Sequence, residues 1–404
     1  MEPFAHAAAG HPGTLQTIDG SLFAKPTSET EIEFYNYIEK RHRKGPTLDI
    51  DAIMSDELKQ LGSGMTIMNL SSTAPCLEGK KIFNGHNEET DEIENVDDDI
   101  PLAIFLPKYY GTLTPGMISI SNSTDIDDDL LRKSLDTLEI DKKTYLLLSN
   151  ALHGFSKPSV LDIKLGRILY ASDATQEKKD RMKRISKATT SGSLGYRIAG
   201  MKLWEDDLFS LKAVVSSDEE EDGQQEDRVD TLHNIIDKLP VIKDIDYSKV
   251  LEIQKPSLLS FNKFFGRNIT ASNMPQALNL FFRYNNLPKE IQDEVIGNFV
   301  TRMQVLYNCL LDEEVRIRSS SLLLVLETDV QRWQRNEFKD NVLPEIEQED
   351  DSEDSYDNES GDIKFKLSTL QLIDFAHAHL TPGKGYDEEL LFGLENLFTL
   401  LKEI

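Results

Sequence analysis

An aspartate and a lysine stand two residues apart in a segment whose polar and apolar residues alternate. The segment is Ser159-Val160-Leu161-Asp162-Ile163-Lys164-Leu165. A strand there would place Val160, Asp162 and Lys164 on one face, because strand side chains repeat every two residues. A carboxylate and an ammonium group that point the same way can orient an acceptor hydroxyl and bind a phosphoryl group during its transfer. The spacing is compatible with phosphoryl transfer, but taken singly the pair is a weak signal.

Two more charged residues, Lys25 and Asp374, lie far from this pair along the chain. Lys25 ends an expected hairpin in which residues 14–17 and 21–25 flank an Asp-Gly turn. Asp374 stands near the end of an expected buried strand, residues 370–375. A lysine ammonium can bind nucleotide phosphates, and an aspartate supplies the hard oxygen that Mg²⁺ prefers. Taken singly, each residue is more often an ordinary structural residue. The predicted chemistry therefore requires that Lys25, Asp374 and the pair of Asp162 and Lys164 meet in one cleft.

The residues after the hairpin predict a helix. Pro26 and Thr27 end the strand, and Ser28 followed three residues later by Glu31 is a capping pair at a helix start. A hairpin, a strand that carries a lysine and a helix that carries a glutamate occur in this order in the small lobe of kinase-like folds. The sequence therefore predicts such a lobe at the N-terminal end.

Residues 157–187 carry an excess of positive charge inside an acidic chain, with nine bases and four acids. A short helix is expected at 174–187, with Lys178, Arg181 and Arg184 at three-residue spacing. The segment predicts an anion site, and a solvated basic face is the alternative. Nucleic acid is disfavoured because the segment lacks interleaved aromatic residues and the acidic runs would repel a polyphosphate backbone. A compact, highly charged small molecule fits better.

Most of the net charge of -27 belongs to three acidic runs. Residues 88–99, 218–230 and 345–359 contribute -8, -7 and -9, so the remaining 364 residues carry only -3. Such runs repel themselves and cannot bury apolar surface. We expect an insertion at about 41–99 and acidic loops at 216–230 and 345–362. They are solvated insertions or a docking surface for a basic partner.

The composition excludes several classes of protein. Two cysteines cannot form a disulfide framework or a cysteine-rich zinc site. The longest apolar run, residues 322–326, is far shorter than the roughly 20 residues of a membrane span. The first residues lack the basic and apolar regions of a secretory signal. We expect a nuclear or cytosolic protein in a reducing compartment.

The remaining periodicity mixes strands and helices without strict alternation, which indicates the α+β class. Strand-like composition is found at residues 100–110, 144–148 and 321–326. Apolar residues at helical spacing predict core helices at 291–310 and 390–401.

A series of motifs begins at residues 158–166, which match the signature PxxxDxKxG. Further motifs follow in order: Ser193–Met201, Ser320–Leu323, Ile373–His377, Gly383–Asp387 and Gly393–Leu397. In these motifs the chain resembles the inositol polyphosphate kinase family, from about Ala9 to the C-terminus apart from the acidic insertions. The resemblance implies a two-lobed, distantly protein-kinase-like fold with ATP in the interlobe cleft. The N-terminal lobe would comprise residues 1–152 and the C-terminal lobe residues 153–404.

The resemblance also implies roles for residues on the nucleotide side of the cleft. Lys25 resembles the lysine that contacts ATP phosphates, with Glu31 as its helix partner and Glu33 as the alternative. Asp374 would bind Mg²⁺, and Ser321 would lie near the metal and the phosphates. The hinge binds adenine chiefly through backbone groups, and many relatives carry an acidic residue there. In this chain the hinge would be formed by Ser149, Asn150 and Ala151.

On the acceptor side, Asp162 resembles the aspartate that orients the acceptor hydroxyl and also contacts the nucleotide. Lys164 resembles the lysine that bridges this hydroxyl and the transferring phosphate. Arg181 is preferred to Arg184 as a substrate contact. The full set of substrate contacts that the resemblance implies is Lys164, Lys178, Arg181 and His377.

Residues 189–193 and the acidic tract before residue 374 resemble the fungal multikinase branch of the family, whose members also regulate arginine-metabolism genes. Only 27 residues, 167–193, separate the signature glycine from the next motif. Trisphosphate-specific relatives carry a larger insertion there, so the short substrate segment implies an open site. The resemblance implies transfer of the ATP γ-phosphate to inositol 1,4,5-trisphosphate and to inositol tetrakisphosphate, giving inositol pentakisphosphate.

A second role in transcription is implied by the same resemblance. It would involve MADS-box transcription factors and the arginine regulatory complex, without direct nucleic-acid binding. We expect a monomer that lies in the nucleus and also in the cytoplasm.

Two other functions compete with this interpretation. A protein kinase is disfavoured because the chain has no His-Arg-Asp or Ala-Pro-Glu segment, and Asp374-Phe375 is followed by Ala376 instead of glycine. The other is an acidic transcriptional scaffold on an inert kinase fold. The presence of every expected ionic residue argues against inertness, but not against an additional non-catalytic role.

Overall fold

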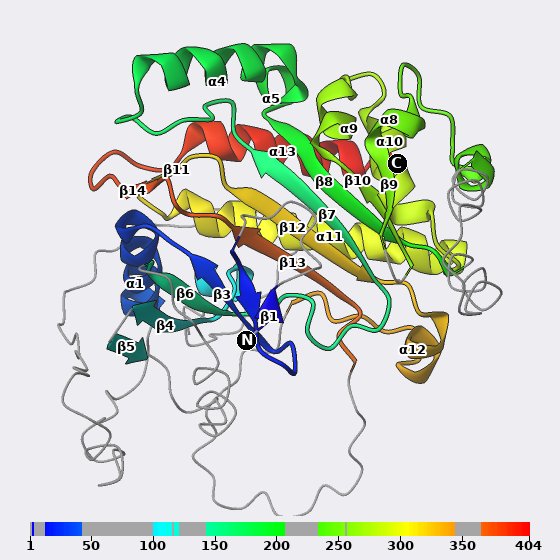
Figure 1. Ribbon diagram of the computed structural model, residues 1–404, viewed down its shortest axis with the longest axis horizontal. Helices are drawn as coiled ribbons and strands as arrows, with labels where there is room; N and C mark the ends of the chain where they lie inside the picture. Colours follow the sequence, from blue (N-terminus) through cyan, green and yellow to red (C-terminus); the bar gives the residue numbers. More distant parts are fainter. Residues whose placement is uncertain are drawn as a thin grey trace, which may run out of the picture.

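The computed structural model describes most of the chain outside the acidic runs. The described residues are 2–3, 13–42, 100–114, 117–120, 143–206, 233–254, 257–343 and 365–404. The expected insertion at 41–99 lies almost entirely outside these residues, and so do the acidic runs at 218–230 and 345–359. In the part described, strands and helices are mixed in an α+β fold (Figure 1). No helix there is long and apolar enough to span a bilayer.

The first sheet has six strands, and all its strand pairs are antiparallel. Across the sheet the order is β1 (Glu2–Pro3), β2 (Leu15–Gln16), β3 (Leu22–Pro26), β6 (Tyr145–Ser149), β4 (Tyr109–Thr114) and β5 (Met117–Ile120). The expected hairpin is β2 and β3, and its turn contains Gly20 with a φ of 74°. The expected helix follows as α1 (Glu29–His42), and the Ser28 hydroxyl accepts a hydrogen bond from the Glu31 N–H at 3.4 Å.

The prediction of a strand over residues 100–110 was wrong. A 3-10 helix, η2 (Leu102–Phe105), occupies most of this range, and the strand β4 begins only at Tyr109. The segment holds Pro101 and Pro107, and a proline cannot donate a hydrogen bond to a neighbouring strand. The buried side chains of Leu102 and Phe105 supply the apolar character that resembled a strand.

The second sheet also has six strands, again paired antiparallel throughout. Its order is β13 (Ser368–Ile373), β12 (Ser321–Glu327), β7 (Pro158–Leu165), β8 (Tyr196–Trp204), β10 (Leu258–Phe261) and β9 (Leu251–Gln254). The expected strand with the Asp162 and Lys164 pair is thus β7, between β12 and β8. Two short strands, β11 (Val315–Ile317) and β14 (Ala378–Leu380), pair separately.

One face of the second sheet forms the main core. Leu161, Ile163 and Leu165 alternate with the polar residues of β7 and are fully buried. The long helices α11 (Lys289–Leu311) and α13 (Glu388–Leu401) lie behind this sheet in Figure 1 and cover that face. The remaining helices are α4 (Gln176–Ala188), α5 (Thr190–Leu194), α8 (Tyr247–Val250), α9 (Lys263–Asn268), α10 (Met274–Arg283) and α12 (Val330–Arg335). On the opposite face of the sheet, Asp162 and Lys164 lie beside the buried Val160.

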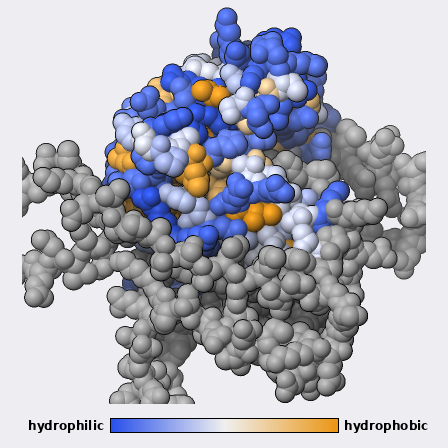
Figure 2. All heavy atoms as spheres, turned by 90° about the vertical axis from the view of Figure 1, so that its left-hand side faces the viewer, coloured by the Kyte–Doolittle hydropathy of each residue, from blue (hydrophilic) through white to orange (hydrophobic). Residues whose placement is uncertain are grey.

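The two sheets are joined by packing between α1 and the residues after β13. The rings of Phe34 and Phe375 stack with their centroids 4.2 Å apart, and Tyr35 packs edge-on against Phe375. Figure 2 shows the side of the molecule that carries α1 and α4, where the described surface is mostly hydrophilic with small separate apolar patches. The polar residues of interest lie where α1, β3, β7 and the end of β13 come together.

Candidate active site

Three neighbouring strands place polar side chains in rows on one face of the second sheet. Paired residues of antiparallel strands point to the same side. Lys164 of β7 pairs with Ser321 of β12 and with Arg197 of β8. Asp162 lies one row away on the same face, because side chains alternate along β7. The predicted face is therefore present, and it includes a serine and an arginine from the flanking strands.

Asp162 is only 3% exposed, and burial determines its protonation. Burial raises the pKa of its carboxyl to about 6, Lys164 opposes this shift, and the neighbouring Asp374 carboxylate adds to it. Within the described residues, Oδ1 of Asp162 has no hydrogen-bond partner. A buried carboxylate oxygen without a hydrogen bond is costly to keep, and this indicates an oxygen that interacts with a ligand.

Lys25 forms a buried ion-pair network that joins the two sheets. Its Nζ donates to Glu31 Oε1 at 2.8 Å and to Asp374 Oδ1 at 2.6 Å. Burial disfavours the charge on Lys25, but Asp374 and Glu31 outweigh it and raise the pKa of the ammonium. Glu33, the alternative partner, is exposed. The structure thus pairs Lys25 with Glu31 and brings Asp374 to the same point.

The backbone around Asp374 is held in a specific conformation. Asp374 has a φ of 68°, a left-handed value that is uncommon for a residue other than glycine. The next N–H, that of Phe375, donates to Glu31 Oε1 at 2.9 Å. Glu31 therefore binds both the lysine and the segment that carries the aspartate, and it holds Asp374 beside Lys25.

A divalent cation fits beside these carboxylates. Asp162 and Asp374 are close enough for each charge to disfavour the other, and Asp162 has an unpartnered oxygen. Hard carboxylate oxygens suit Mg²⁺ or Mn²⁺. Among the residues that the structure describes, no group of three or more His, Cys, Asp or Glu side chains could hold a metal alone. A cation here would therefore require further oxygen ligands, such as nucleotide phosphates.

Lys164 is held by a backbone carbonyl. Its Nζ donates to the Ser319 oxygen at 2.8 Å, and Ser319 has a left-handed φ of 60°. The contact fixes the end of a long, flexible side chain on the row that also holds Ser321. The ammonium therefore lies next to the row of Asp162, as the alternation predicted.

The expected acceptor-binding residues gather near His377. Burial and the nearby Lys178 ammonium lower the pKa of His377, and Lys164 acts in the same direction. Lys178 reaches this point from the first turns of α4, the expected basic helix. Arg181 lies on the same helix, but it is exposed and the structure gives it no contact with this group. Three of the four expected substrate contacts are thus brought together.

Arg197 was missed by sequence reasoning. It is half-buried, lies opposite Lys164 on β8 and donates from Nη1 to the Ser191 hydroxyl at 2.8 Å. Burial and the nearby Arg267 lower its pKa to about 10, and Asp162 opposes this shift. Its place within the motif Ser193–Met201 was the available signal. A half-buried cation on this row adds to the positive charge of the acceptor side.

The connector between the two sheets, residues 149–152, has one backbone N–H that is available to a ligand. Both hydrogen-bond donors of Asn150 are used within the protein. Its N–H donates to the Ser21 carbonyl at 2.8 Å, and its side-chain nitrogen donates to the Gly20 carbonyl at 2.8 Å. Ser149 exchanges hydrogen bonds with Lys108, its N–H and its hydroxyl oxygen each 2.9 Å from the partner atom. Among residues 149–152, as the structure describes them, the Ala151 N–H has no partner.

A cavity of about 460 Å³ adjoins this connector. Its lining includes Gly20 of the hairpin turn, Asn150 of the connector and Val160 of β7. It therefore reaches from the first sheet to the strand that carries Asp162, two residues beyond Val160 on the same face.

Comparison with known proteins gives consistent matches. A family model described as inositol polyphosphate kinase matches residues 145–402. The inositol polyphosphate multikinase of Saccharomyces cerevisiae is 34% identical, with 98% of this chain and 96% of that protein covered. The multikinase of Schizosaccharomyces pombe is 35% identical over 29% of this chain and 41% of that protein. Human inositol hexakisphosphate kinase 1 is 25% identical, with 65% and 54% covered.

A solved structure shows the same fold. The crystal structure of the S. cerevisiae inositol phosphate multikinase in complex with ADP and Mn²⁺ has a TM-score of 0.57 and 28% identity to this chain. The similarity covers 95% of this chain and 99% of that one.

Proposed function

The chain belongs to the inositol polyphosphate kinase family of ATP-dependent kinases, and from this premise we propose that it is an inositol polyphosphate multikinase. It would transfer the ATP γ-phosphate to inositol 1,4,5-trisphosphate and to inositol tetrakisphosphate, giving inositol pentakisphosphate. The 34% identity with the S. cerevisiae multikinase over nearly the whole chain supports the multikinase assignment.

One observation carries this proposal. Lys25 and Asp374 are 349 positions apart in sequence, but their side chains meet at 2.6 Å, and the Asp374 charge also reaches the buried Asp162. This proximity supports a single cleft in which the proposed nucleotide-binding and acceptor-binding groups would lie together. Phosphoryl transfer is achieved mainly by positioning and by stabilisation of charge, and this cleft combines both.

The roles of the nucleotide-binding residues follow from their places. Lys25, held by Glu31, would bind nucleotide phosphates, and the free Ala151 N–H of the connector would bind the base. A bound divalent cation, held by Asp374 and beside Asp162 and Ser321, would neutralise phosphate charge. The serine and asparagine of the connector face other protein groups, so the base would be read through the backbone without a carboxylate.

The acceptor-binding residues divide the chemistry between them. Asp162 would accept a hydrogen bond from the attacking hydroxyl and take its proton, for which a raised pKa near 6 is suitable. Lys164 would bind the transferring phosphoryl group, and Lys178, His377 and Arg197 would bind phosphates of the inositol. Arg181 is exposed one helical turn beyond Lys178, where it would contact an outlying phosphate.

The breadth of acceptors is attributed to the short substrate segment. Its main element, α4, has 13 residues and exposes most of its basic side chains. A site that is lined by a single exposed helix is open on one side, so it would accept inositol phosphates with different numbers and positions of phosphates.

The test is turnover by the purified protein. With ATP, Mg²⁺ and inositol 1,4,5-trisphosphate we expect sequential formation of tetrakisphosphate and pentakisphosphate, separated by chromatography against isomer standards. Lys164→Ala should lower kcat by about a hundredfold or more, because it removes charge from the transferring group. Lys249→Ala, an exposed lysine far from the cleft in an ion pair with Asp246, is the control. Absence of product from the parent protein would contradict the proposal.

We also propose a second role in the transcriptional regulation of arginine metabolism, with MADS-box transcription factors as partners, in a monomeric protein of the nucleus and the cytoplasm. The concentration of charge in three acidic runs supports it, because such runs attract basic partners. Deletion of residues 345–359 should abolish partner binding in a pull-down and leave turnover intact. Unchanged binding would leave only the solvated-insertion interpretation for residues 345–359, and a parent protein that binds the partner without turnover would favour the inert scaffold.

A further inference from the structure

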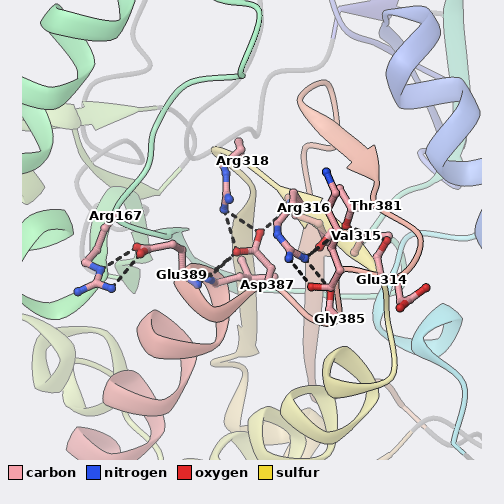
Figure 3. A network of polar contacts seen from close by, with 12 residues as sticks. Arg167, Glu314, Val315, Arg316, Arg318, Thr381, Gly385, Asp387 and Glu389 are labelled. Carbon is pink, nitrogen blue, oxygen red and sulfur yellow. Dashed lines mark hydrogen bonds and ion pairs between the residues drawn. The ribbon is translucent and has the colours of Figure 1, made fainter. Parts of the chain in front are cut away.

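The last residue of the glycine-rich motif before α13, Asp387, has no role in the site described above. Its side chain is 3% exposed. The carboxylate caps α13 by accepting hydrogen bonds from the N–H groups of Glu389 at 3.2 Å and Leu390 at 3.4 Å. It also accepts from a different segment, namely from the Ile317 N–H at 2.8 Å. The Arg318 guanidinium of the same segment donates to it at 2.8 Å (Figure 3). One buried carboxylate therefore ties two parts of the chain together.

The segment that Asp387 binds runs from the last residue of β11 to the start of β12, and we call residues 317–320 the 317–320 strap. The strap contacts the acceptor side through its backbone at three successive residues. The Arg318 N–H donates to the His377 carbonyl at 3.2 Å, the Ser319 carbonyl accepts from Lys164 Nζ at 2.8 Å, and the Ser320 carbonyl accepts from the Leu165 N–H at 3.0 Å. The strap thus holds both Lys164, the proposed ligand of the transferring phosphoryl group, and His377, a proposed ligand of the inositol phosphate.

The conformation of the strap is held from both sides. Ser319 has a φ of 60°, which a serine retains only where its surroundings enforce it. On one side, the Ser319 hydroxyl donates to the Leu169 carbonyl at 3.0 Å. On the other, Ile317 and Arg318 are fixed by Asp387. The left-handed residue between these anchors directs its carbonyl toward Lys164.

We propose that Asp387 is a positioning residue for the acceptor site: by fixing the 317–320 strap through Arg318, it sets the places of the Lys164 ammonium and of His377. Asp387 itself touches neither acceptor nor nucleotide. The proposal rests on the proposed kinase function, because that function makes Lys164 and His377 substrate-binding residues. It adds a function to a motif that would otherwise count only as a helix start.

The test is Asp387→Asn, with kinetics for both substrates. Asparagine keeps the size of the side chain and an oxygen that can cap α13, but it removes the charge that pairs with Arg318. We expect KM for inositol 1,4,5-trisphosphate, and its dissociation constant measured by calorimetry, to rise about tenfold. KM for ATP should rise less, because Lys164 would contact only the transferring phosphoryl group of the nucleotide, whereas Lys25, the proposed partner of the nucleotide phosphates, is held by Glu31 and Asp374.

The matched control is Glu389→Gln. It removes another ion pair at the same helix end, that between Glu389 and Arg167 at 2.7 Å (Figure 3), and leaves the strap untouched. Both KM values should stay unchanged. Equal changes in both KM values for Asp387→Asn, or no change in trisphosphate binding, would overturn the positioning role. A parent protein that binds the trisphosphate without phosphorylating it would remove the proposed function, while the binding comparison would still decide this inference.

Discussion

At the residue scale, the buried carboxylate of Asp162 lowers the stability of the folded protein when it is charged. Its carboxyl has a pKa of 3.8 in the unfolded chain and about 6 in the folded protein, chiefly because it is buried. A group whose folded pKa is raised by burial destabilises the fold when it is charged, above about pH 6, and this penalty disappears as the pH falls below the unfolded value. The residue is thus costly at neutral pH, where its charge is needed.

Asp162→Asn separates stability from activity. At pH 8 the variant should be more stable by up to about 3 kcal/mol, which corresponds to the shift in pKa, and the difference should vanish near pH 4. Turnover should fall by a factor of about 100 to 10,000, because the acceptor hydroxyl loses its base. Denaturant unfolding at the two pH values and initial rates measure both effects. A variant that is less stable at pH 8, or one that retains full activity, would contradict this account.

Single residues were predictable where a motif fixes their spacing. Asp162 and Lys164 share a face because of strand alternation, and the structure confirms this geometry. Arg197 was not predictable in the same way, because the register between β7 and β8 shifts between Asp162 and Ile163. The Ser319 carbonyl that holds Lys164 is a backbone group, so no side-chain pattern could indicate it.

At the scale of elements, the turn from α5 into β8 depends on close backbone contact with α13. Gly195 ends α5 with a φ of 78°, and a Cβ there would lie 2.8 Å from the Gly393 Cα and 2.6 Å from the Phe392 ring. The Gly195 carbonyl also accepts from the Gly166 N–H at 2.7 Å, directly after β7. This turn therefore holds the strand of Arg197 and the strand of Lys164 against the same helix.

Gly195→Ala should destabilise the protein by roughly 2–5 kcal/mol, from the left-handed backbone and from the overlap with α13. Thermal unfolding should show a clear drop in Tm. Gly297→Ala in α11 is the matched control, because nothing lies within 4 Å of the position of its Cβ. In a helix interior this change should stabilise by about 0.5–1 kcal/mol. An equal Tm for the two variants would show that the close approach is unimportant.

Whole elements were predicted best where periodicity was long or where charge marked a helix. The stripe at 291–310 became α11, and the basic segment at 174–187 became α4. Residues 100–110 failed because apolar composition alone does not distinguish a strand from a buried 3-10 turn between prolines. The apolar composition correctly indicated that the side chains are buried, and the two prolines were the signal against a strand.

At the scale of the molecule, the cleft is made by contacts between distant parts of the chain. Glu31 accepts hydrogen bonds from Lys25, from the Thr27 hydroxyl at 2.9 Å and from the Phe375 N–H at 2.9 Å, 344 positions away. No local pattern predicts such a meeting. The family resemblance supplied it as an expectation, while the sequence could not choose between Glu31 and Glu33, because both lie in the first turns of one helix.

Glu31→Gln tests whether the contacts of Glu31 with Lys25 and Phe375 affect the binding of the nucleotide but not that of the acceptor. Glutamine keeps an oxygen for the Phe375 N–H, so the two sheets should remain joined, but Lys25 loses one of its two charged partners. We expect KM for ATP to rise about tenfold, which corresponds to the loss of one charge-assisted contact of 1–2 kcal/mol. Binding of inositol 1,4,5-trisphosphate, measured by calorimetry without nucleotide, should not change. Glu33→Gln, two residues away and exposed, should behave as the parent protein. Equal effects of the two substitutions would mean that the general charge of α1, and not the buried contact at its start, sets the affinity for the nucleotide.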